Sequence, residues 1–297
     1  MTEFAVIDIG SNSIRYAEER GGALPEKEIY TTRLGSGLAE TGLLAKETMS
    51  RSLEVIERLA SRAGAAGLKP AAYATSAVRD AENGREFAAL VEERTGVPVE
   101  ILEGSEEARL AFSGAVGNGS GYDTLLDIGG ASMQVVRTDY AASFPAGCVR
   151  CGDVARGALR LPDCDTLWST QQMVVDGYVD GVMDLPKLEV KALVGIGGTI
   201  TTLAALEAGL AVFDRSAVET VTLTRSGVRR LISRLAEMGA KRAEHPLLRE
   251  RHDVILYGAY ILHHAMERLK ADSMGVSCAD GMEGYLRLLK TREADDE

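Results

Sequence analysis

Two stretches of the chain place an aspartate and a glycine turn directly after an apolar run. In the first, AVIDIGSNSI, Asp8 is followed by Gly10, Ser11, Asn12 and Ser13. Glycine lets backbone N–H groups approach a ligand closely, and the hydroxyl and amide side chains offer further donors. Because such donors bind phosphate and a strand-end carboxylate suits a hydrated divalent cation, the stretch predicts a phosphate loop beside a metal.

A second stretch, TLLDIGGASM, repeats this form 119 residues later, with Asp127 in the place of Asp8. The turn that follows consists of Gly129, Gly130, Ala131 and Ser132. A third stretch, GIGGT, brings Gly197, Gly198 and Thr199 to the start of a predicted helix, where backbone N–H groups bind anions. The two matched copies predict an internal duplication, with one loop in each half of the chain.

A simpler interpretation explains each stretch separately. An aspartate before a glycine turn can accept hydrogen bonds from the turn itself, and an ordinary hairpin of this kind needs no ligand. The two matched copies and the third glycine-rich loop favour the phosphate-binding interpretation.

Helix and strand patterns alternate between these loops. Apolar residues recur every three or four positions from Met49 to Ala63, which predicts a helix over 48–63. Ser105 is the expected N-cap of another helix, with Glu106 and Glu107 in its first turn. Further predictions are strands in PAAYATSAVRD and VPVEILEG, helices over 83–95, 225–238 and 253–269, a strand in SMGVS and a terminal helix, while 140–187 shows no clear pattern. The alternation favours an α/β fold.

The stretch GNGSG at 117–121 is the best candidate for a linker between domains. It divides the chain into a first domain, 1–117, and a second domain, 118–282, and we expect the terminal helix at 283–297 to complete the first. The two domains are predicted to face each other across a cleft, each contributing its own loop.

Composition excludes several classes of protein. The net charge of the 297 residues is -11, which argues against broad nucleic-acid binding because that requires a basic surface. No run of 18 apolar residues occurs, so we predict neither a membrane span nor a membrane partner. The N-terminus enters a strand pattern without a basic start or cleavage site, so we expect a cytoplasmic protein.

The cysteines allow two interpretations. Cys148 and Cys151 form a C-x-x-C pair, and Cys164 follows them, which would fit a zinc or redox site. No fourth ligand is evident, and we therefore expect buried, reduced thiols.

The ordered set of motifs resembles the Ppx/GppA family of exopolyphosphatases and guanosine pentaphosphate phosphatases. The stretches that carry the resemblance are AVIDIGSNSIR at 5–15, ATSAVRDAENGREF at 74–87, VEILEGSEEARL at 99–110, LLDIGGAS at 125–132, GIGGTITTLAAL at 195–206 and GVSCADGMEGYL at 275–286. The resemblance implies two duplicated ribonuclease-H-like domains with a cleft between them, the fold of actin, Hsp70 and sugar kinases.

The resemblance also implies an activity: Mg²⁺-dependent hydrolysis of the terminal phosphoryl group of inorganic polyphosphate or of a guanosine tetra- or pentaphosphate. Asn12 and Ser13 match the family's first phosphate loop, Arg79 its substrate-phosphate arginine and Glu107 its catalytic base. Asp127, Gly129, Gly130 and Ser132 match its second loop. Phosphoryl transfer needs charge neutralisation and in-line positioning, and a carboxylate at a helix start can orient and deprotonate a water. A homodimer is one expected state of assembly.

One departure affects the second loop. The family pattern is Gly-Gly-Gly-Ser-Thr-Glu, whereas this chain has Ala131, Met133 and Gln134 in place of a Gly, the Thr and the Glu. The resemblance implies that the Glu assists the metal or the water. Gln134 keeps the shape of that side chain but loses its charge, so we expect weaker metal binding and slower turnover.

Alternatives remain open at the level of sequence. Glu106 and Glu107 would also fit as ordinary first-turn helix acids, and Arg79 as a partner of Asp80 or Glu82. A protein that senses polyphosphate or guanosine phosphates with little turnover would explain Gln134. An ATP-dependent kinase or chaperone-like ATPase of the same fold is a further rival, although the motifs around Arg79 and Glu107 argue against it.

Overall fold

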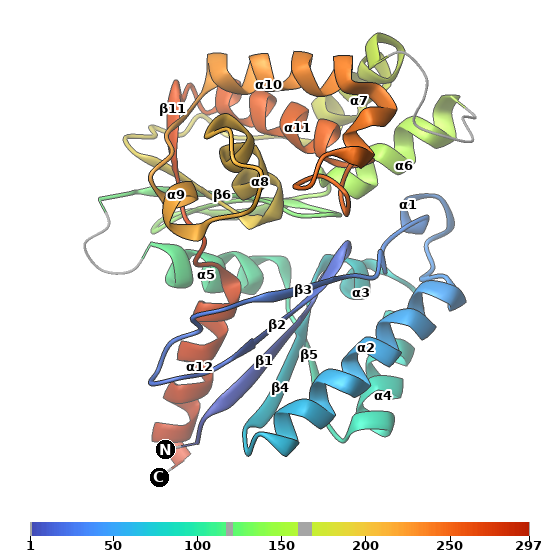
Figure 1. Ribbon diagram of the computed structural model, residues 1–297, viewed down its shortest axis with the longest axis vertical. Coiled ribbons are helices and arrows are strands. Elements are labelled where there is room, and N and C mark those ends of the chain that lie inside the picture. Colours follow the sequence, from blue (N-terminus) through green and yellow to red (C-terminus); the bar gives the residue numbers. More distant parts are fainter. Residues whose placement is uncertain (1, 117–120, 160–167, 297) are drawn as a thin grey trace. The chain divides into compact units, whose positions relative to one another are not determined.

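The computed structural model describes residues 2–116, 121–159 and 168–296, which form two compact units (Figure 1). Unit 1 comprises Met1–Gly114 and Gly281–Glu297, and unit 2 comprises Ala115–Asp280. The predicted boundary between 117 and 118 lies outside the described residues, as does most of the predicted linker. Each unit has its own sheet and its own hydrophobic core.

Unit 1 contains one five-stranded sheet and its covering helices. The strands are β1 (Phe4–Ile9), β2 (Ser13–Glu18), β3 (Glu28–Thr31), β4 (Lys69–Ala74) and β5 (Val99–Ile101). The helices are α1 (Leu38–Thr41), α2 (Lys46–Ala65), α3 (Ser76–Asp80), α4 (Gly84–Thr95), α5 (Gly104–Ala115) and α12 (Gly281–Asp296).

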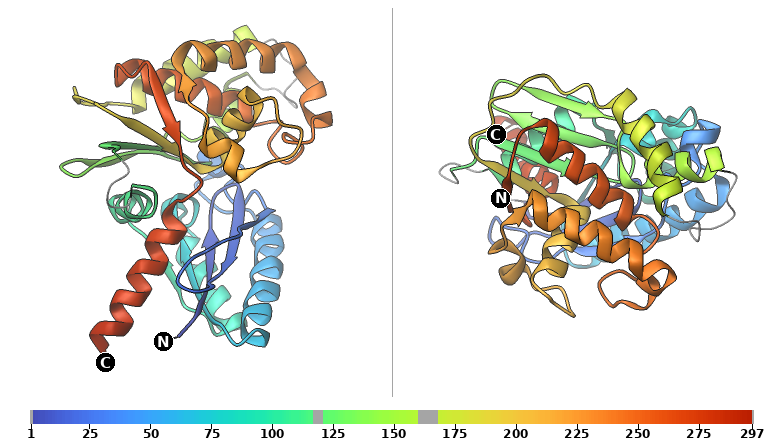
Figure 2. Two further views of the ribbon diagram at one scale, coloured as in Figure 1. Left: turned by 60° about the vertical axis from the view of Figure 1, so that its left-hand side comes forward. Right: turned by 90° about the horizontal axis from the view of Figure 1, so that it is seen from above.

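The sheet of unit 1 has the strand order β3-β2-β1-β4-β5. The first three strands are antiparallel neighbours, and β4 and β5 continue the sheet parallel to β1. Ile7 and Ile9 of β1 pack into the core that α2 and α4 complete, whereas Phe4 and Val6 pack with residues of α12 on the opposite face. Figures 1 and 2 show these helices on the two faces of the sheet. The uninterrupted apolar run of β1 therefore reflects a central strand that is covered on both sides.

Unit 2 contains a six-stranded sheet. Its strands are β6 (Thr124–Ile128), β7 (Met133–Arg137), β8 (Ala141–Phe144), β9 (Leu193–Ile196), β10 (Leu223–Thr224) and β11 (Ser273–Val276). Its helices are α6 (Cys148–Leu159), α7 (Trp168–Val182), α8 (Gly197–Glu207), α9 (Arg215–Glu219), α10 (Arg225–Met238) and α11 (Ile255–Arg268), with a 3₁₀ helix at Gly239–Glu244.

The two sheets share one topology, as the internal repeat predicts. The order in unit 2 is β10-β11-β9-β6-β7-β8. Three antiparallel strands, β6 to β8, are followed by β9 and β11 parallel to β6, as β1 to β3 are followed by β4 and β5. Strand β10 is an addition at the edge of the second sheet. Both glycine turns therefore join the first strand of a unit to its second.

Three local predictions differ from the structure. The strand predicted in PAAYATSAVRD ends at Ala74, and its second half, Ser76–Asp80, forms α3. Ser105 is not the N-cap of α5, because the helix already begins at Gly104. The side chain of Glu106, the third residue of α5, instead accepts a hydrogen bond from the N–H of Glu103 at 3.1 Å. Glu106 therefore caps the backbone N–H of the residue that precedes the helix. The unpatterned segment 140–187 contains β8, α6 and α7. Within the described ranges no helix is long and apolar enough to cross a membrane.

Candidate active site

The first loop, residues 10–13, is the turn between β1 and β2. The N–H of Gly10 donates to the carbonyl of Ser13 at 3.1 Å. A Cβ at Gly10 would lie only 2.8 Å from that oxygen, so the turn requires glycine. Asn12 Nδ2 donates to Ser13 Oγ at 3.3 Å, and Ser11 Oγ lies 3.2 Å from Ser76 Oγ at the start of α3. The predicted phosphate donors of unit 1 thus lie together in one tight turn.

Asp8 lies in β1 directly opposite Arg15 of β2. Arg15 Nε donates to Asp8 Oδ2 at 2.8 Å, its Nη2 reaches the same oxygen, and the Asp8 side chain is 2% exposed. A carboxylate bound in this way by a guanidinium has its charge compensated. A cation at Asp8 would compete with Arg15, a residue of the first motif that the sequence did not lead us to single out.

Arg79 and Glu107, predicted as phosphate ligand and base, lie together in unit 1. Arg79 Nη1 donates to Glu107 Oε2 at 3.0 Å and to the carbonyl of Leu102 at 3.0 Å. Its Nε contacts Asp80 Oδ1 at 3.3 Å, as the alternative interpretation of Arg79 proposed. The side chains of Arg79 and Glu107 are each 16% exposed, so both reach solvent from a partly buried position. Arg79 thereby holds the carboxylate of Glu107 in one orientation.

The second loop, residues 129–132, repeats the turn of the first. The N–H of Gly129 donates to the carbonyl of Ser132 at 2.9 Å. Gln134 faces Asp127 across the hairpin, as Arg15 faces Asp8 in unit 1. Gln134 is 1% exposed, and its Nε2 donates to Ser132 Oγ at 3.0 Å. The amide group that replaces the expected carboxylate therefore bonds directly to the loop.

The third loop, residues 197–199, begins α8 and meets the second loop within unit 2. Gly197 has a left-handed backbone (φ 84°), and a Cβ there would lie 2.3 Å from Asp127 Oδ1. A Cβ at Gly198 would lie 2.5 Å from Arg251 Nη1. Asp127 and Arg251 thus border the start of α8 with one negative and one positive charge. Arg251 was not predicted, because no motif marks it and only the fold brings it to this loop.

Cys148 and Cys151 lie in α6 as buried thiols without a disulfide, as expected. Burial raises the pKa of both thiols, which keeps them protonated and unreactive near neutral pH. Cys164 lies outside the described residues. Among the residues described, no group of three or more His, Cys, Asp or Glu side chains could hold a metal ion by itself.

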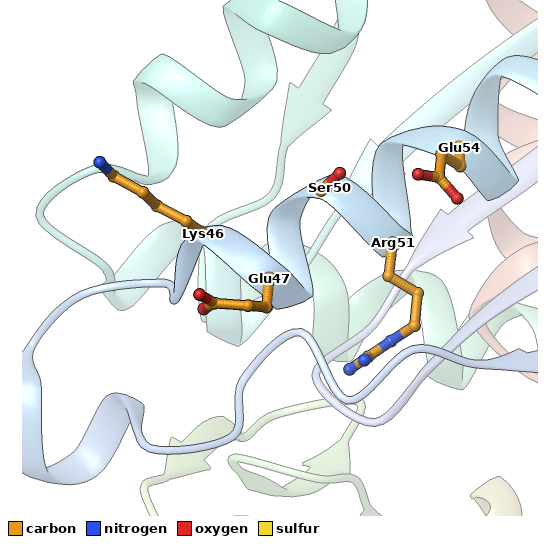
Figure 3. A pocket seen from close by; sticks show the side chains of 5 residues that line it. All are labelled: Lys46, Glu47, Ser50, Arg51 and Glu54. Carbon is orange, nitrogen blue, oxygen red and sulfur yellow. The ribbon is translucent and has the colours of Figure 1, made fainter.

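A shallow hollow on unit 1 is lined by residues of one helix. Its lining consists of Lys46, Glu47, Ser50, Arg51 and Glu54 on the first turns of α2 (Figure 3). Arg51 Nε donates to the carbonyl of Thr32 at 3.0 Å, so this cation anchors the segment after β3. No predicted site residue lines the hollow.

Two α/β units of matched topology, each with a glycine turn between its first two strands, define a protein of the duplicated ribonuclease-H-like, actin-like fold. The sequence model of the Ppx/GppA phosphatase family matches residues 18–288, and the chain therefore belongs to this family of phosphatases. The first loop precedes the matched range. The predicted fold class and the predicted enzyme class, a hydrolase, are confirmed.

Several relatives support this assignment. Exopolyphosphatase 2 of Mycobacterium tuberculosis is 28% identical, over 96% of this chain and 97% of that protein. The crystal structure of the Aquifex aeolicus member of the Ppx/GppA family is 26% identical over 98% of each chain, with a TM-score of 0.77. An exopolyphosphatase structure from Cytophaga hutchinsonii, 21% identical over 97% of each chain, has a TM-score of 0.82 and shows the likeness of fold. The predicted cleft, homodimer and cytoplasmic location stay predictions.

Proposed function

We propose that this protein hydrolyses the terminal phosphoryl group of inorganic polyphosphate, with guanosine penta- and tetraphosphate as alternative substrates. The observation that carries the proposal is the pair Arg79 and Glu107, a cation and a carboxylate 3.0 Å apart in the unit that also holds the first loop. The similarity to Exopolyphosphatase 2 of Mycobacterium tuberculosis supports polyphosphate as substrate.

Each group has a role in this proposal. The turn N–H groups of the first and second loops bind phosphate oxygens, and Arg79 binds a further phosphate. Glu107 orients a water and accepts its proton as the water attacks phosphorus. Gly198 and Thr199 bind phosphate at the N-terminal end of α8, an 11-residue helix whose first N–H groups attract anions.

Magnesium is part of the proposal, and the donor set fits it. Mg²⁺ is commonly held by one or two carboxylates together with substrate phosphates rather than by a full protein cage. Asp127 fits this role, because its carboxylate lies against the third loop. Asp8 fits it less well, since Arg15 already compensates its charge. When bound, the ion would neutralise developing charge on the phosphate oxygens.

A phosphate-release assay tests the function. Tripolyphosphate, long-chain polyphosphate and guanosine pentaphosphate are each incubated with the protein, in Mg²⁺ and in excess chelator. We expect release from at least one polyphosphate in Mg²⁺ and its loss in chelator. Tight binding of all three substrates without release would favour the alternative function, a sensor of these polyanions. Hydrolysis of ATP alone would favour an ATPase of the same fold.

Gln134 is the observation that favours the sensor. We predict that Gln134→Glu lowers the Mg²⁺ concentration needed for half-maximal phosphate release, because a divalent ion prefers anionic oxygen ligands. Ser132 Oγ can donate to the new carboxylate, so the hydrogen bond within the loop can persist. The buried charge should also lower the melting temperature in chelator and make the protein respond more strongly to Mg²⁺ than the wild type. An activity ratio that stays flat across a Mg²⁺ series would show that position 134 does not serve the metal.

Arg79→Ala is expected to raise KM by about ten- to hundredfold, the size of a lost charge-assisted hydrogen bond. The turnover number should fall as well, since Glu107 loses the donor that orients it. Arg79→Lys should restore part of the affinity, because an ammonium keeps the charge but not the paired geometry. Arg85→Ala, an exposed arginine on α4, controls for the loss of one positive charge. Unchanged KM in both Arg79 variants would remove Arg79 from the phosphate site.

A further inference from the structure

The carbonyl groups of Gly129, Gly130 and Ala131 in the second loop all accept hydrogen bonds from the start of α6. The N–H of Cys148 donates to the carbonyl of Gly129 at 3.0 Å, and the N–H groups of Val149 and Arg150 donate to that of Gly130 at 2.7 and 3.1 Å. The third carbonyl, that of Ala131, accepts from Arg150 Nε at 3.0 Å. The start of α6 therefore fixes three successive peptide groups of the loop.

This arrangement determines where the loop N–H groups point. The peptide bonds of the loop are trans, and in a trans peptide the carbonyl and the following N–H point in opposite directions. Because the carbonyls of 129–131 face α6, the N–H groups of 130–132 face away from it. The second loop thus presents three donors to the side on which a phosphate would bind.

The carbonyl groups of the first loop are bound by the segment that follows β3. This segment corresponds in topology to the one that follows β8 in unit 2. After β3, the N–H of Arg33 donates to the carbonyl of Asn12 at 2.8 Å, and the N–H of Gly35 donates to that of Ser11 at 2.8 Å. The recurrence in the sheet of the other unit indicates that holding the loop carbonyls belongs to the function of both loops. In unit 2, however, one of the three carbonyls, that of Ala131, is bound by a side chain, that of Arg150.

Arg150 is itself held in place. Gly147 packs its Cα against the loop so closely that a Cβ would lie 2.3 Å from the carbonyl oxygen of Gly130. The guanidinium of Arg150 also interacts with the hydroxyl of Tyr178 on α7, and that hydroxyl donates to the carbonyl of Pro145 at 2.6 Å. Tyr178 thus connects α7 to Pro145 and to Arg150, the two ends of segment 145–150.

We propose that Arg150 is a positioning residue for phosphate binding: it orients the Ala131–Ser132 peptide through the Ala131 carbonyl, and Tyr178 holds it in that position. Arg150 acts through the geometry of its hydrogen bonds rather than through its charge. The proposal rests on the proposed function, because it assigns the loop N–H groups to substrate phosphate.

The test compares Arg150→Lys, Arg150→Ala, Tyr178→Phe and an exposed control on α10, Arg229→Ala. The affinity for tripolyphosphate is measured by calorimetry, phosphate release by assay, and loop protection by amide hydrogen exchange of residues 129–136. Arg150→Lys keeps the charge, but a single ammonium cannot hold Ala131 and Tyr178 together in the guanidinium geometry. We expect about ten- to hundredfold weaker binding and faster exchange in Arg150→Lys, smaller changes in the same direction in Tyr178→Phe, and wild-type behaviour in Arg229→Ala.

The outcomes separate the two proposals. If the wild type binds and hydrolyses tripolyphosphate and the variants at Arg150 and Tyr178 match it in affinity and exchange, Arg150 has no positioning role. If Arg150→Lys retains wild-type affinity while Arg150→Ala loses it, charge rather than geometry is responsible, which also overturns the proposal. If the wild type hydrolyses no phosphate but exchange rises in Arg150→Lys and Tyr178→Phe, the proposed function fails and the positioning of the loop stands.

Discussion

Glu107→Gln is expected to lower phosphate release by about 10²–10⁴-fold, the usual contribution of a positioned general base, while binding of tripolyphosphate persists. The substitution preserves the surroundings of the site. Gln offers an amide oxygen in place of Oε2, which accepts from Arg79 at 3.0 Å, and Arg79 keeps its second bond, to the carbonyl of Leu102, at 3.0 Å. What the variant loses is the ability to take a proton from water.

The neighbouring Glu106 supplies a matched control for this prediction. Both glutamates lie in the first turn of α5, but Glu106 is exposed and its carboxylate accepts from the N–H of Glu103 at 3.1 Å. Glu106→Gln should therefore cost a few tenths of a kcal/mol of stability at most, because the amide oxygen can still accept that bond and only the charge at the helix start is lost. Phosphate release should stay at the wild-type level. A loss below threefold in Glu107→Gln, or equal losses in both variants, would show that Glu107 is not the base.

The α/β class followed from local features of the sequence, whereas the duplicated ribonuclease-H-like fold was implied by the resemblance of the motifs to a family. Apolar runs such as that of β1, together with glycine turns that occur twice, are determined by neighbouring residues and are visible without a structure. The helix predicted over 225–238 matches α10, whose bounds are Arg225 and Met238. The C-terminal end of α4 was also predictable, because Gly96 adopts the left-handed backbone (φ 70°) that a glycine after a helix allows.

The segment 140–187 was not predictable, and its glycines are the physical reason. Gly152 lies inside α6, and Gly177 and Gly181 lie inside α7. Each glycine lowers the intrinsic preference for helix by about 1 kcal/mol relative to alanine. The helices form because tertiary burial compensates, as the fully buried Val175 and Val179 of α7 indicate.

Contacts between distant residues limited the prediction of the site in a similar way. Arg251 lies 53 positions after Gly198 in the sequence, yet a Cβ on Gly198 would lie 2.5 Å from its guanidinium. The pairing of Arg79 with Glu107, 28 positions apart, likewise depends on α3 and α5, which follow the neighbouring parallel strands β4 and β5. No periodicity encodes such contacts. The pairing of Arg15 with Asp8 was predictable, because both residues lie in one hairpin and the register of its strands places them opposite each other.

Gly197→Ala is expected to lower phosphate release by about a hundredfold. Two costs combine at this position. A left-handed backbone costs a residue with a Cβ about 1–2 kcal/mol, and the new Cβ would lie 2.3 Å from Asp127 Oδ1. Either the Asp127 carboxylate or the start of α8 must then move, and a displacement of about 1 Å in a phosphoryl-transfer site can cost about 10²-fold in rate.

Alanine substitutions at two other glycines separate the cost of the left-handed backbone from the cost of the steric contact. Gly209, which follows α8, has a similar left-handed backbone (φ 68°) but nothing within 4 Å of the position of its Cβ. Gly209→Ala should therefore lower the melting temperature and leave phosphate release unchanged. Gly198 has an ordinary backbone, and its Cβ would meet the far end of Arg251, at 2.5 Å from Nη1. Because that side chain can move aside, Gly198→Ala should have an intermediate effect on release and little effect on stability.

The measurements are thermal unfolding and phosphate release over a Mg²⁺ series for the three variants. The backbone cost alone would make Gly197→Ala and Gly209→Ala alike in both measurements. Displacement of Asp127 adds a requirement for more Mg²⁺ in Gly197→Ala only, since that carboxylate is the proposed ligand of the ion. If Gly197→Ala keeps the wild-type Mg²⁺ dependence and loses only stability, then Asp127 does not hold the metal, and the contact between the second and third loops serves packing rather than catalysis.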